Sequence, residues 1–297
     1  MQEQEEPKKR KTPSKDKATA PGVISAGACD KGTVPSSHPV EVSIEPLKVI
    51  DTSRPVLFVS GSPFGASPDL IKELAPHAGY IIALDSGGDK LKAAGLVPDL
   101  LLVDFDSITE DTLSHFKAEF VPLRGFDSYK NATDVELGIE ELSSLGFRSV
   151  IATNVLGARS DHALGSLGAL AGAALDRGMQ ILLRDNSEAC FFVSSNAPDK
   201  MLQLEYEDET LVSATSFVAG QKSSIHPPCL PLRRPKHVSL ISWGGQVTVS
   251  LKGTEWELDH HDLGPFSALG VSNKLVAPTL QLTVHKGNGT VLLLLTC

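Results

Sequence analysis

A regular alternation of short apolar runs and helical segments is the feature that most constrains the fold of this 297-residue chain. Short apolar runs suit buried strands, and the segments between them have the spacing of amphipathic helices. Strands are predicted near 56–60, 80–84, 100–103, 149–156 and 180–184, and helices near 68–75, 87–94, 133–145 and 161–177. This rhythm is typical of βαβ units that build a parallel sheet. We therefore expect a Rossmann-like α/β domain over residues 51–185.

The pattern changes after that domain. From His237 onward, short runs of period two separated by turns predict an antiparallel β-sandwich or barrel over residues 237–297. Residues 186–236 contain several prolines, so an irregular insertion or linker is expected there. Residues 1–50 lack apolar periodicity and are expected to be a disordered tail.

Composition narrows the possible partners. The net charge of −9 argues against a nucleic-acid partner. No apolar run has the length of a membrane span, so a soluble, cytoplasmic protein without a membrane partner is expected. The basic cluster Lys8–Lys11 leaves nuclear import as a less favoured alternative. The four cysteines lack the spacing of a zinc site or a disulfide framework and are expected to be free thiols.

Acidic residues follow two of the predicted strands. Asp104 and Asp106 come after the run at 100–103, and alternation along a strand would point both side chains the same way. Asp85 closes the run at 80–84, and Gly87 and Gly88 allow a tight turn behind it. Since the carboxyl ends of parallel strands meet at one edge, the pattern indicates a magnesium and phosphate site. An acidic turn without a ligand is the simpler alternative.

Two helix starts add polar groups to the same edge. Thr133 and Glu136 have the spacing of a capping box, which places Asp134 in the first helical turn. An acid there also complements the helix dipole, so its presence alone does not indicate a site. Arg159, ahead of the helix predicted near 161–177, has a side chain suited to phosphate oxygens.

Five segments, taken in order, resemble the motif set of the thiamine pyrophosphokinase family. They are Asp85–Leu91, Pro98–Leu100 with Asp104–Ser107, Lys130–Asp134, Gly157–His162 and Gly270–Asn273. The resemblance extends from about Val56 to the end of the sequence. Enzymes of that family transfer the terminal diphosphate of ATP to the hydroxyl of thiamine, giving thiamine diphosphate and AMP. The resemblance therefore implies a thiamine diphosphokinase that uses Mg²⁺ and takes ATP as co-substrate.

The resemblance also implies roles for individual residues. The reaction centre is expected at Asp85, Asp104, Asp106 and Asp134, of which the first three hold the metal. The nucleotide is expected near Gly87, Gly88, Lys130, Thr133, Arg159 and Asp161. Asp106 is the candidate for accepting the hydroxyl proton, although the sequence does not identify the general base. His162 has two equal interpretations, contact with the nucleotide or support of the turn.

The thiamine site is implied by matches in the C-terminal part. Trp256, Ser272 and Asn273 align with family residues expected to contact thiamine, and the β domain is expected to form a homodimer. Stacking of Trp256 on a thiamine ring and burial of Trp256 in the core remain equal alternatives.

Two departures from the family pattern leave other functions open. The chain has Asp85-Ser-Gly-Gly-Asp89 where the family usually has Asp-Gly-Gly-Ala-Asn, and Asn131 stands where an acid is usual. A degenerate member that binds thiamine or nucleotide as a sensor is therefore an alternative. A Rossmann-type oxidoreductase is a weaker one, since the G-x-G-x-x-G spacing is absent.

Overall fold

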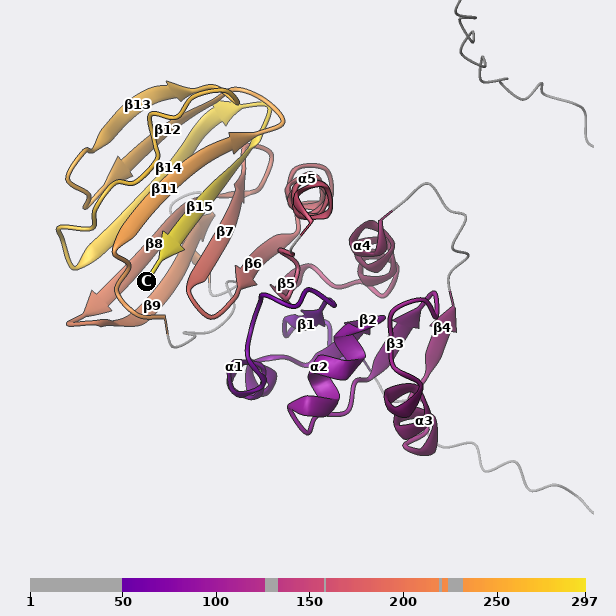
Figure 1. Ribbon diagram of the computed structural model, residues 1–297. Helices are drawn as coiled ribbons and strands as arrows, with labels where there is room; N and C mark the ends of the chain where they lie inside the picture. The colour runs from indigo at the N-terminus through magenta and orange to yellow at the C-terminus, as the bar shows by residue number, and fades with distance from the viewer. Residues whose placement is uncertain (1–49, 126–132, 158, 219–220, 224–231) are drawn as a thin grey trace, which may run out of the picture. The chain divides into compact units, whose positions relative to one another are not determined.

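The computed structural model describes residues 50–125, 133–157, 159–218, 221–223 and 232–297 (Figure 1). The predicted tail, apart from Ile50, lies outside these residues. The alternation of strands and helices is confirmed. The strands are β1 (Val56–Val59), β2 (Tyr80–Leu84), β3 (Leu100–Val103), β5 (Ser149–Thr153) and β6 (Gln180–Arg184). The helices are α1 (Pro68–Leu74), followed by the short 3₁₀ turn η1 (Ala75–His77), α2 (Gly87–Ala93), α4 (Asp134–Ser144) and α5 (Ser160–Arg177).

Sequence reasoning missed two elements, α3 (Glu110–Ala118) and β4 (Leu123–Gly125). Helix α3 buries only Thr112 and Phe116, so it has no apolar stripe to detect. Its start is nevertheless marked locally, because the Thr109 side chain accepts a hydrogen bond from the backbone N–H of Thr112. Strand β4 has only three residues and lies at the edge of its sheet.

A nine-stranded sheet in the order β11-β15-β7-β6-β5-β1-β2-β3-β4 forms the centre of the protein. The strands from β6 to β4 in this order are parallel, and β1 pairs with β2 on one side and with β5 on the other. The parallel strands β1, β3, β5 and β6 are buried along their whole length, as expected of strands covered on both faces.

The prediction that residues 186–236 are irregular is wrong. This segment contains β7 (Glu188–Ser194), β8 (Asp199–Glu207), β9 (Thr210–Val218) and the short β10 (Gln221–Ser223). The prolines that suggested irregular structure, at 227 and beyond, come after the last of these strands and so break none of them.

The C-terminal strands belong to two sheets, so the division expected at residue 237 does not separate them. β11 (His237–Trp243) and β15 (Thr290–Thr296) extend the nine-stranded sheet, where β15 pairs antiparallel with β7. β12 (Val247–Lys252), β13 (Leu258–Leu263) and β14 (Thr279–Gly287) join β8, β9 and β10 in an antiparallel six-stranded sheet. The fold class of a parallel sheet with helices followed by an antiparallel sheet is confirmed.

Two hydrophobic cores lie on opposite faces of the nine-stranded sheet (Figure 1). On one face, α4 and α5 contribute residues such as Ile139 and Leu170. On the other face, α1, α2 and α3 cover the parallel strands, and the six-stranded sheet covers β11, β15 and β7 with residues such as Leu204 and Val249. The antiparallel part is therefore a sandwich rather than a barrel.

Two further findings concern the described ranges. Every helix in them is too short or too polar to traverse a lipid bilayer. Of the cysteines, Cys190 and Cys297 are free thiols, while Cys29 and Cys229 lie outside the described residues.

Candidate functional site

The candidate site lies where the direction of chain progression across the sheet reverses. From β1 the chain proceeds outward through β2, β3 and β4, and it then returns to the other side of β1 with β5 and β6. The helices that follow β1 and β5, α1 and α5, therefore lie on opposite faces of the sheet, and open α/β sheets bind ligands in the crevice between two such strands. A cleft of about 440 Å³ occupies this position. It is lined by Ser60, Gly61, Ser62, Pro63, Leu84, Asp85, Ser86, Asp106, Ser107, Thr133, Asp134, Val135, Val155, Gly157, Arg159, His162 and Ser166.

Three of the predicted acids meet at the ends of neighbouring strands. Carboxylate oxygens of Asp85, Asp104 and Asp106 lie within 4.8 Å of one another, and this is the only such group of potential metal ligands in the described part of the chain. Asp85 directly follows β2 and is buried, whereas Asp106 is exposed to the cleft. The sequence prediction that these residues come together is thus matched by the geometry.

A turn, and not strand alternation, brings Asp104 and Asp106 together. Strand β3 ends at Val103, and Phe105 has a left-handed backbone with φ of 68°. The side chain of Asp104 accepts a hydrogen bond of 3.1 Å from the backbone N–H of Asp106, which closes the turn. The predicted mechanism of convergence is therefore wrong, although its outcome is correct.

The buried carboxylate of Asp85 is satisfied on one oxygen only. The backbone N–H of Ser107 donates to Asp85 Oδ2 at 3.0 Å, and the Ser107 hydroxyl donates to the same oxygen. Asp85 Oδ1 is also buried, and no amide or hydroxyl of the described residues donates to it. A buried carboxylate oxygen without a donor, on a residue grouped with two other carboxylates, fits a divalent cation with oxygen ligands, such as Mg²⁺.

Negative charge dominates the electrostatics of the cluster. Hydrogen bonding with Asp104, loss of hydration and repulsion by Asp104 and Asp85 raise the pKa of Asp106 to about 6. Loss of hydration at the cleft wall, followed by repulsion from Asp104 and Asp85, raises the pKa of Asp134. A cation in the cluster would reverse both effects, because it favours the ionised carboxylates.

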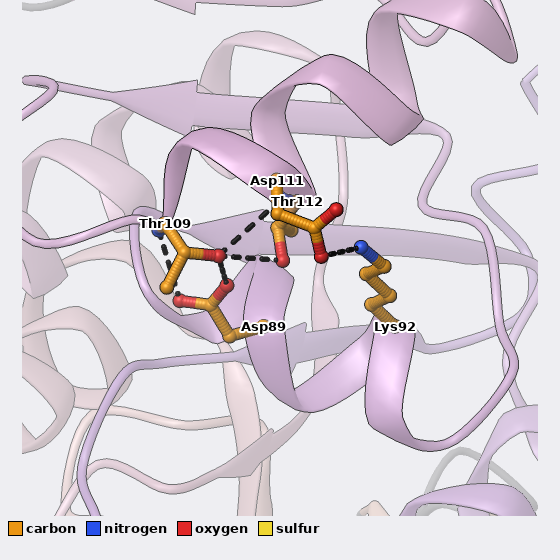
Figure 2. A network of polar contacts seen from close by, with 5 residues as sticks. All are labelled: Asp89, Lys92, Thr109, Asp111 and Thr112. Atoms are coloured by element: carbon orange, nitrogen blue, oxygen red, sulfur yellow. Dashed lines mark hydrogen bonds and ion pairs between the residues drawn. The ribbon is translucent and has the colours of Figure 1, made fainter.

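A polar network holds the far end of the acidic loop (Figure 2). The hydroxyl of Thr109 donates to Asp89 at 2.6 Å, and the backbone N–H of Thr109 donates to the other carboxylate oxygen. Lys92 and Asp111 form an ion pair between α2 and α3 beside it. Residues 104–109 are therefore anchored at one end by β3 and at the other by α2.

The helix N-termini at the cleft match the predicted signals in part. The capping box at α4 is confirmed, since Glu136 accepts from the backbone N–H of Thr133 and Thr133 accepts from that of Glu136. Arg159 lines the cleft, but its guanidinium is paired with Asp161 at 2.6 and 3.2 Å, and Asp161 is not among the lining residues. Lys130 and Asn131 lie outside the described residues.

The structure does not place Gly87 and Gly88 on the cleft. A Cβ on Gly87 would lie 2.1 Å from the carbonyl oxygen of Val59, so α2 packs against the end of β1 only with glycine there. Gly88 is buried against Leu101, Ile108 and Phe116. The geometry thus gives both glycines a packing function.

Sequence reasoning missed the loop after β1, residues 60–67. Asn154, after β5, is buried with φ of 55° and donates from Nδ2 to the carbonyl oxygens of Ser62 and Ala66 at 3.1 and 3.3 Å. Asp185 in turn accepts from the backbone N–H of Asn154 at 3.0 Å. The rule that strand ends build sites would have indicated Ser60–Ser62, but no sequence signal pairs Asn154 with this loop.

The predicted thiamine residues come together, but away from the cleft lining. Trp256 follows β12, the residue is 59 % exposed, and it is therefore not a core residue. Asn273 is buried and bonds the backbone of Trp256, while Ser272 is exposed with φ of 62°. None of the three is among the residues that line the cleft.

Two family models match separate parts of this chain. The model of the thiamin pyrophosphokinase catalytic domain matches residues 71–183, and that of the thiamin pyrophosphokinase vitamin B1 binding domain matches residues 229–289. The thiamine pyrophosphokinase of Bacillus subtilis (strain 168) is 28% identical over 114 residues, which are 38% of this chain. That match spans about half, 53%, of the Bacillus subtilis protein.

Solved structures share the fold. A thiamine pyrophosphokinase from Bacillus subtilis has a TM-score of 0.62 at 20% identity, and the match covers 82% of this chain and 99% of that one. The Candida albicans thiamin pyrophosphokinase has a TM-score of 0.59 at 13% identity, covering 82% and 89%. With both family domains present in order along one sequence, this chain belongs to the thiamin pyrophosphokinase family.

Proposed function

We propose that this protein transfers the terminal diphosphate of ATP to the hydroxyl of thiamine, giving thiamine diphosphate and AMP. The observation that carries the proposal is the cluster of Asp85, Asp104 and Asp106 at the cleft between β1 and β5, in a chain with both domains of this family. Transfer of a phosphoryl group depends mainly on positioning and on neutralising charge, which a rigid carboxylate cluster with its metal supplies.

Asp85, Asp104 and Asp106 are the residues that would hold Mg²⁺. The bound ion would neutralise charge on the phosphate oxygens during the transfer. Ser107 orients the Asp85 carboxylate through two hydrogen bonds to Oδ2, and Oδ1 has no hydrogen-bond donor among the described residues. Asp106, which is exposed in the cleft, is our candidate for accepting the proton of the attacking hydroxyl.

The nucleotide is proposed to lie along the α4 and α5 starts. Thr133, Asp134 and Arg159 line the cleft there. Asp161 holds Arg159 in the absence of nucleotide, and the exposed guanidinium is free to exchange this surface contact for phosphate oxygens. Lys130 stays in the proposed set on the sequence motif alone, and Gly87 and Gly88 contribute by setting the position of α2.

Thiamine is proposed to bind at Trp256 and Ser272, with a second copy of the chain completing the site. Residues 256–276 expose five large apolar side chains, Trp256, Phe266, Leu269, Val271 and Val276. An exposed apolar segment of this kind marks an interaction surface. We propose a homodimer through this segment, so that thiamine reaches the cleft of one of the two copies. The cytoplasmic location and the absence of a nucleic-acid partner stay predictions.

A coupled assay for AMP release tests the proposed reaction. The full chain is incubated with ATP and Mg²⁺, with thiamine and without any acceptor, and matched samples contain EDTA. We expect AMP release that requires both thiamine and Mg²⁺. Calorimetric binding of thiamine or ATP without AMP release would instead identify a sensor, and thiamine-independent reduction of a nicotinamide cofactor would identify an oxidoreductase.

A further inference from the structure

Asn273 makes an unusually complete set of contacts with one neighbouring residue. Its side-chain Oδ1 accepts from the backbone N–H of Trp256 at 3.1 Å, and its Nδ2 donates to the carbonyl oxygen of Trp256 at 2.6 Å. Both backbone polar groups of Trp256 are therefore bound by one side chain. The Asn273 amide takes the place that a neighbouring strand would have in a sheet.

The rest of the Asn273 side chain is occupied as well. Nδ2 also donates to Thr254 Oγ1 at 3.1 Å, and Oδ1 also accepts from the backbone N–H of Lys274 at 2.8 Å. The residue is 5 % exposed. Two donors and two acceptor positions are thus used within the protein, which leaves no polar atom of Asn273 for a ligand.

The backbone of Asn273 is fixed to a different sheet. Its N–H and C=O each form a 2.9 Å hydrogen bond with Val238 of β11, in the nine-stranded sheet. Trp256 follows β12, in the six-stranded sheet. Asn273 therefore links β11 of the nine-stranded sheet to Trp256, which lies between β12 and β13 of the six-stranded sheet.

The position of Trp256 depends on these backbone bonds. The residue is 59 % exposed, so packing in the core does not hold it. Preceding residues have backbone partners of their own, because Glu255 N donates to Lys274 O and Val276 N donates to Gly253 O. At Trp256 itself, the side chains of Asn273 and Thr254 bond the backbone N–H and C=O.

We infer that Asn273 is a positioning residue that fixes the Trp256 ring for ligand stacking and does not itself bind thiamine. The inference deepens the proposed function, on which its kinetic part rests. A ring that is held before binding loses less conformational freedom when the ligand arrives, and so binds more tightly. Loss of the Asn273 amide should free the ring while leaving the catalytic cleft intact.

Fluorescence of Trp256 tests the positioning directly. The chain has two tryptophans, so Trp243→Phe leaves Trp256 as the single fluorophore. In this background, Asn273→Asp keeps an oxygen that accepts from the Trp256 N–H. It replaces the amide donor with a second oxygen, which faces the carbonyl oxygen of Trp256. Without any substrate, we expect lower fluorescence anisotropy and stronger acrylamide quenching in Asn273→Asp. Lys274→Ala, which removes only a surface ion pair with Glu255, should leave both signals unchanged.

Kinetics on the same variants separate positioning from ligand binding. We expect Asn273→Asp to raise KM for thiamine about three- to tenfold, with KM for ATP unchanged. In a Trp256→Ala background, the same change should have no further effect on KM for thiamine. If Asn273 instead bound thiamine directly, the effects of Asn273→Asp and Trp256→Ala on KM for thiamine would add, and the anisotropy of Trp256 without substrate would stay unaltered. That result would overturn the inference.

Two further measurements keep the inference testable. If Asn273→Asp melts much earlier than the parent, Asn273→Gln is used instead, because the longer side chain keeps the amide but displaces it from Trp256 N and O. Unchanged Trp256 anisotropy in a folded variant at position 273 would refute positioning. If the protein releases no AMP with thiamine, the proposed function fails, while the anisotropy result still decides whether Asn273 fixes Trp256.

Discussion

Asp85, Asp104 and Asp106 differ in burial although they belong to one cluster. Asp85 is buried and accepts two hydrogen bonds from Ser107, whereas Asp104 and Asp106 are less buried and lie in a turn that the Asp104 side chain closes. Substitution of Asp85 therefore affects folding and function together. An amide at either turn position keeps the shape of the side chain, including the Asp104 acceptor, and so tests function with little effect on folding.

We predict that Asp104→Asn and Asp106→Asn lower kcat about 100-fold or more while melting temperature stays close to that of the parent. An amide keeps the shape of each side chain but removes the charge that attracts Mg²⁺. AMP release at limiting and saturating Mg²⁺ and thermal melting are the measurements. Asp111→Asn is the matched control, since this exposed acid pairs only with Lys92 on the surface. Near-parental rates at limiting Mg²⁺ would remove the two residues from the site.

At the scale of elements, the loop after β1 is fixed to β5 and β6 by side chains. Asn154 bonds two carbonyl oxygens of the loop, and Asp185 bonds Asn154 and the hydroxyl of Thr153. Burial raises the pKa of Asp185, and the hydrogen bonds from Asn154 and Thr153 partly offset this effect. One wall of the cleft thus depends on a buried network between strand ends.

We predict that Asn154→Gly destabilises the fold by roughly 1–3 kcal/mol and raises KM for ATP more than KM for thiamine. Glycine keeps the left-handed backbone of this position and removes only the amide. Asn154→Ala should cost about 1 kcal/mol more, because alanine is strained at φ of 55°. Urea denaturation and steady-state kinetics provide both numbers. Equal effects on the two Michaelis constants would contradict the contact with ATP that this prediction assigns to the loop after β1.

A second prediction at this scale concerns the six-stranded sheet and pH. The rings of His260 and His285 are stacked with centroids 3.9 Å apart, and His285 Nε2 lies 2.8 Å from Ser250 Oγ. Burial and then repulsion by His260 lower the pKa of His285, against attraction by Asp259.

The folded protein therefore binds fewer protons at His285 than the unfolded chain does. This contribution to stability is fully present above the ordinary histidine pKa of about 6.5 and is lost as pH falls below it. We predict that His285→Gln lessens the fall in unfolding free energy between about pH 7.5 and 5.5. His237→Gln, at an exposed position, serves as control. An identical pH slope in His285→Gln and the parent would disprove the linkage.

At the scale of the whole molecule, the proposed dimer forms through the exposed apolar segment, residues 256–276. We predict a homodimer in sedimentation, and dissociation when Phe266→Asp and Leu269→Asp are combined, since charges on an apolar interface oppose its burial. KM for thiamine should rise with dissociation. Phe120→Asp is the matched control, because Phe120 is equally exposed but follows α3.

One observation would contradict the predicted homodimer. A strict monomer that turns over thiamine at the parental rate at nanomolar concentration would show that one chain completes the site. In that case the exposed residues between 256 and 276 would need another explanation.

The sequence by itself determined the features that depend on neighbouring residues. Strands β1, β2, β3, β5 and β6, the capping box at Thr133 and Glu136, and the acids that follow strands are encoded in short windows, because apolar periodicity and caps act over a few residues. The ordered family motifs extended this to the candidate site.

Only the tertiary structure decided the features that join distant segments. β15 pairs with β7, which lies about a hundred residues earlier in the chain, and Asn154 bonds Ser62 and Ala66 over a similar separation. β11 lies in a different sheet from β12, although the two follow each other in the chain. The register of such pairs follows from packing free energy summed over many contacts, and no local pattern records it. The same holds for Asn273, whose identity suggested a ligand contact and whose surroundings make it the support of Trp256.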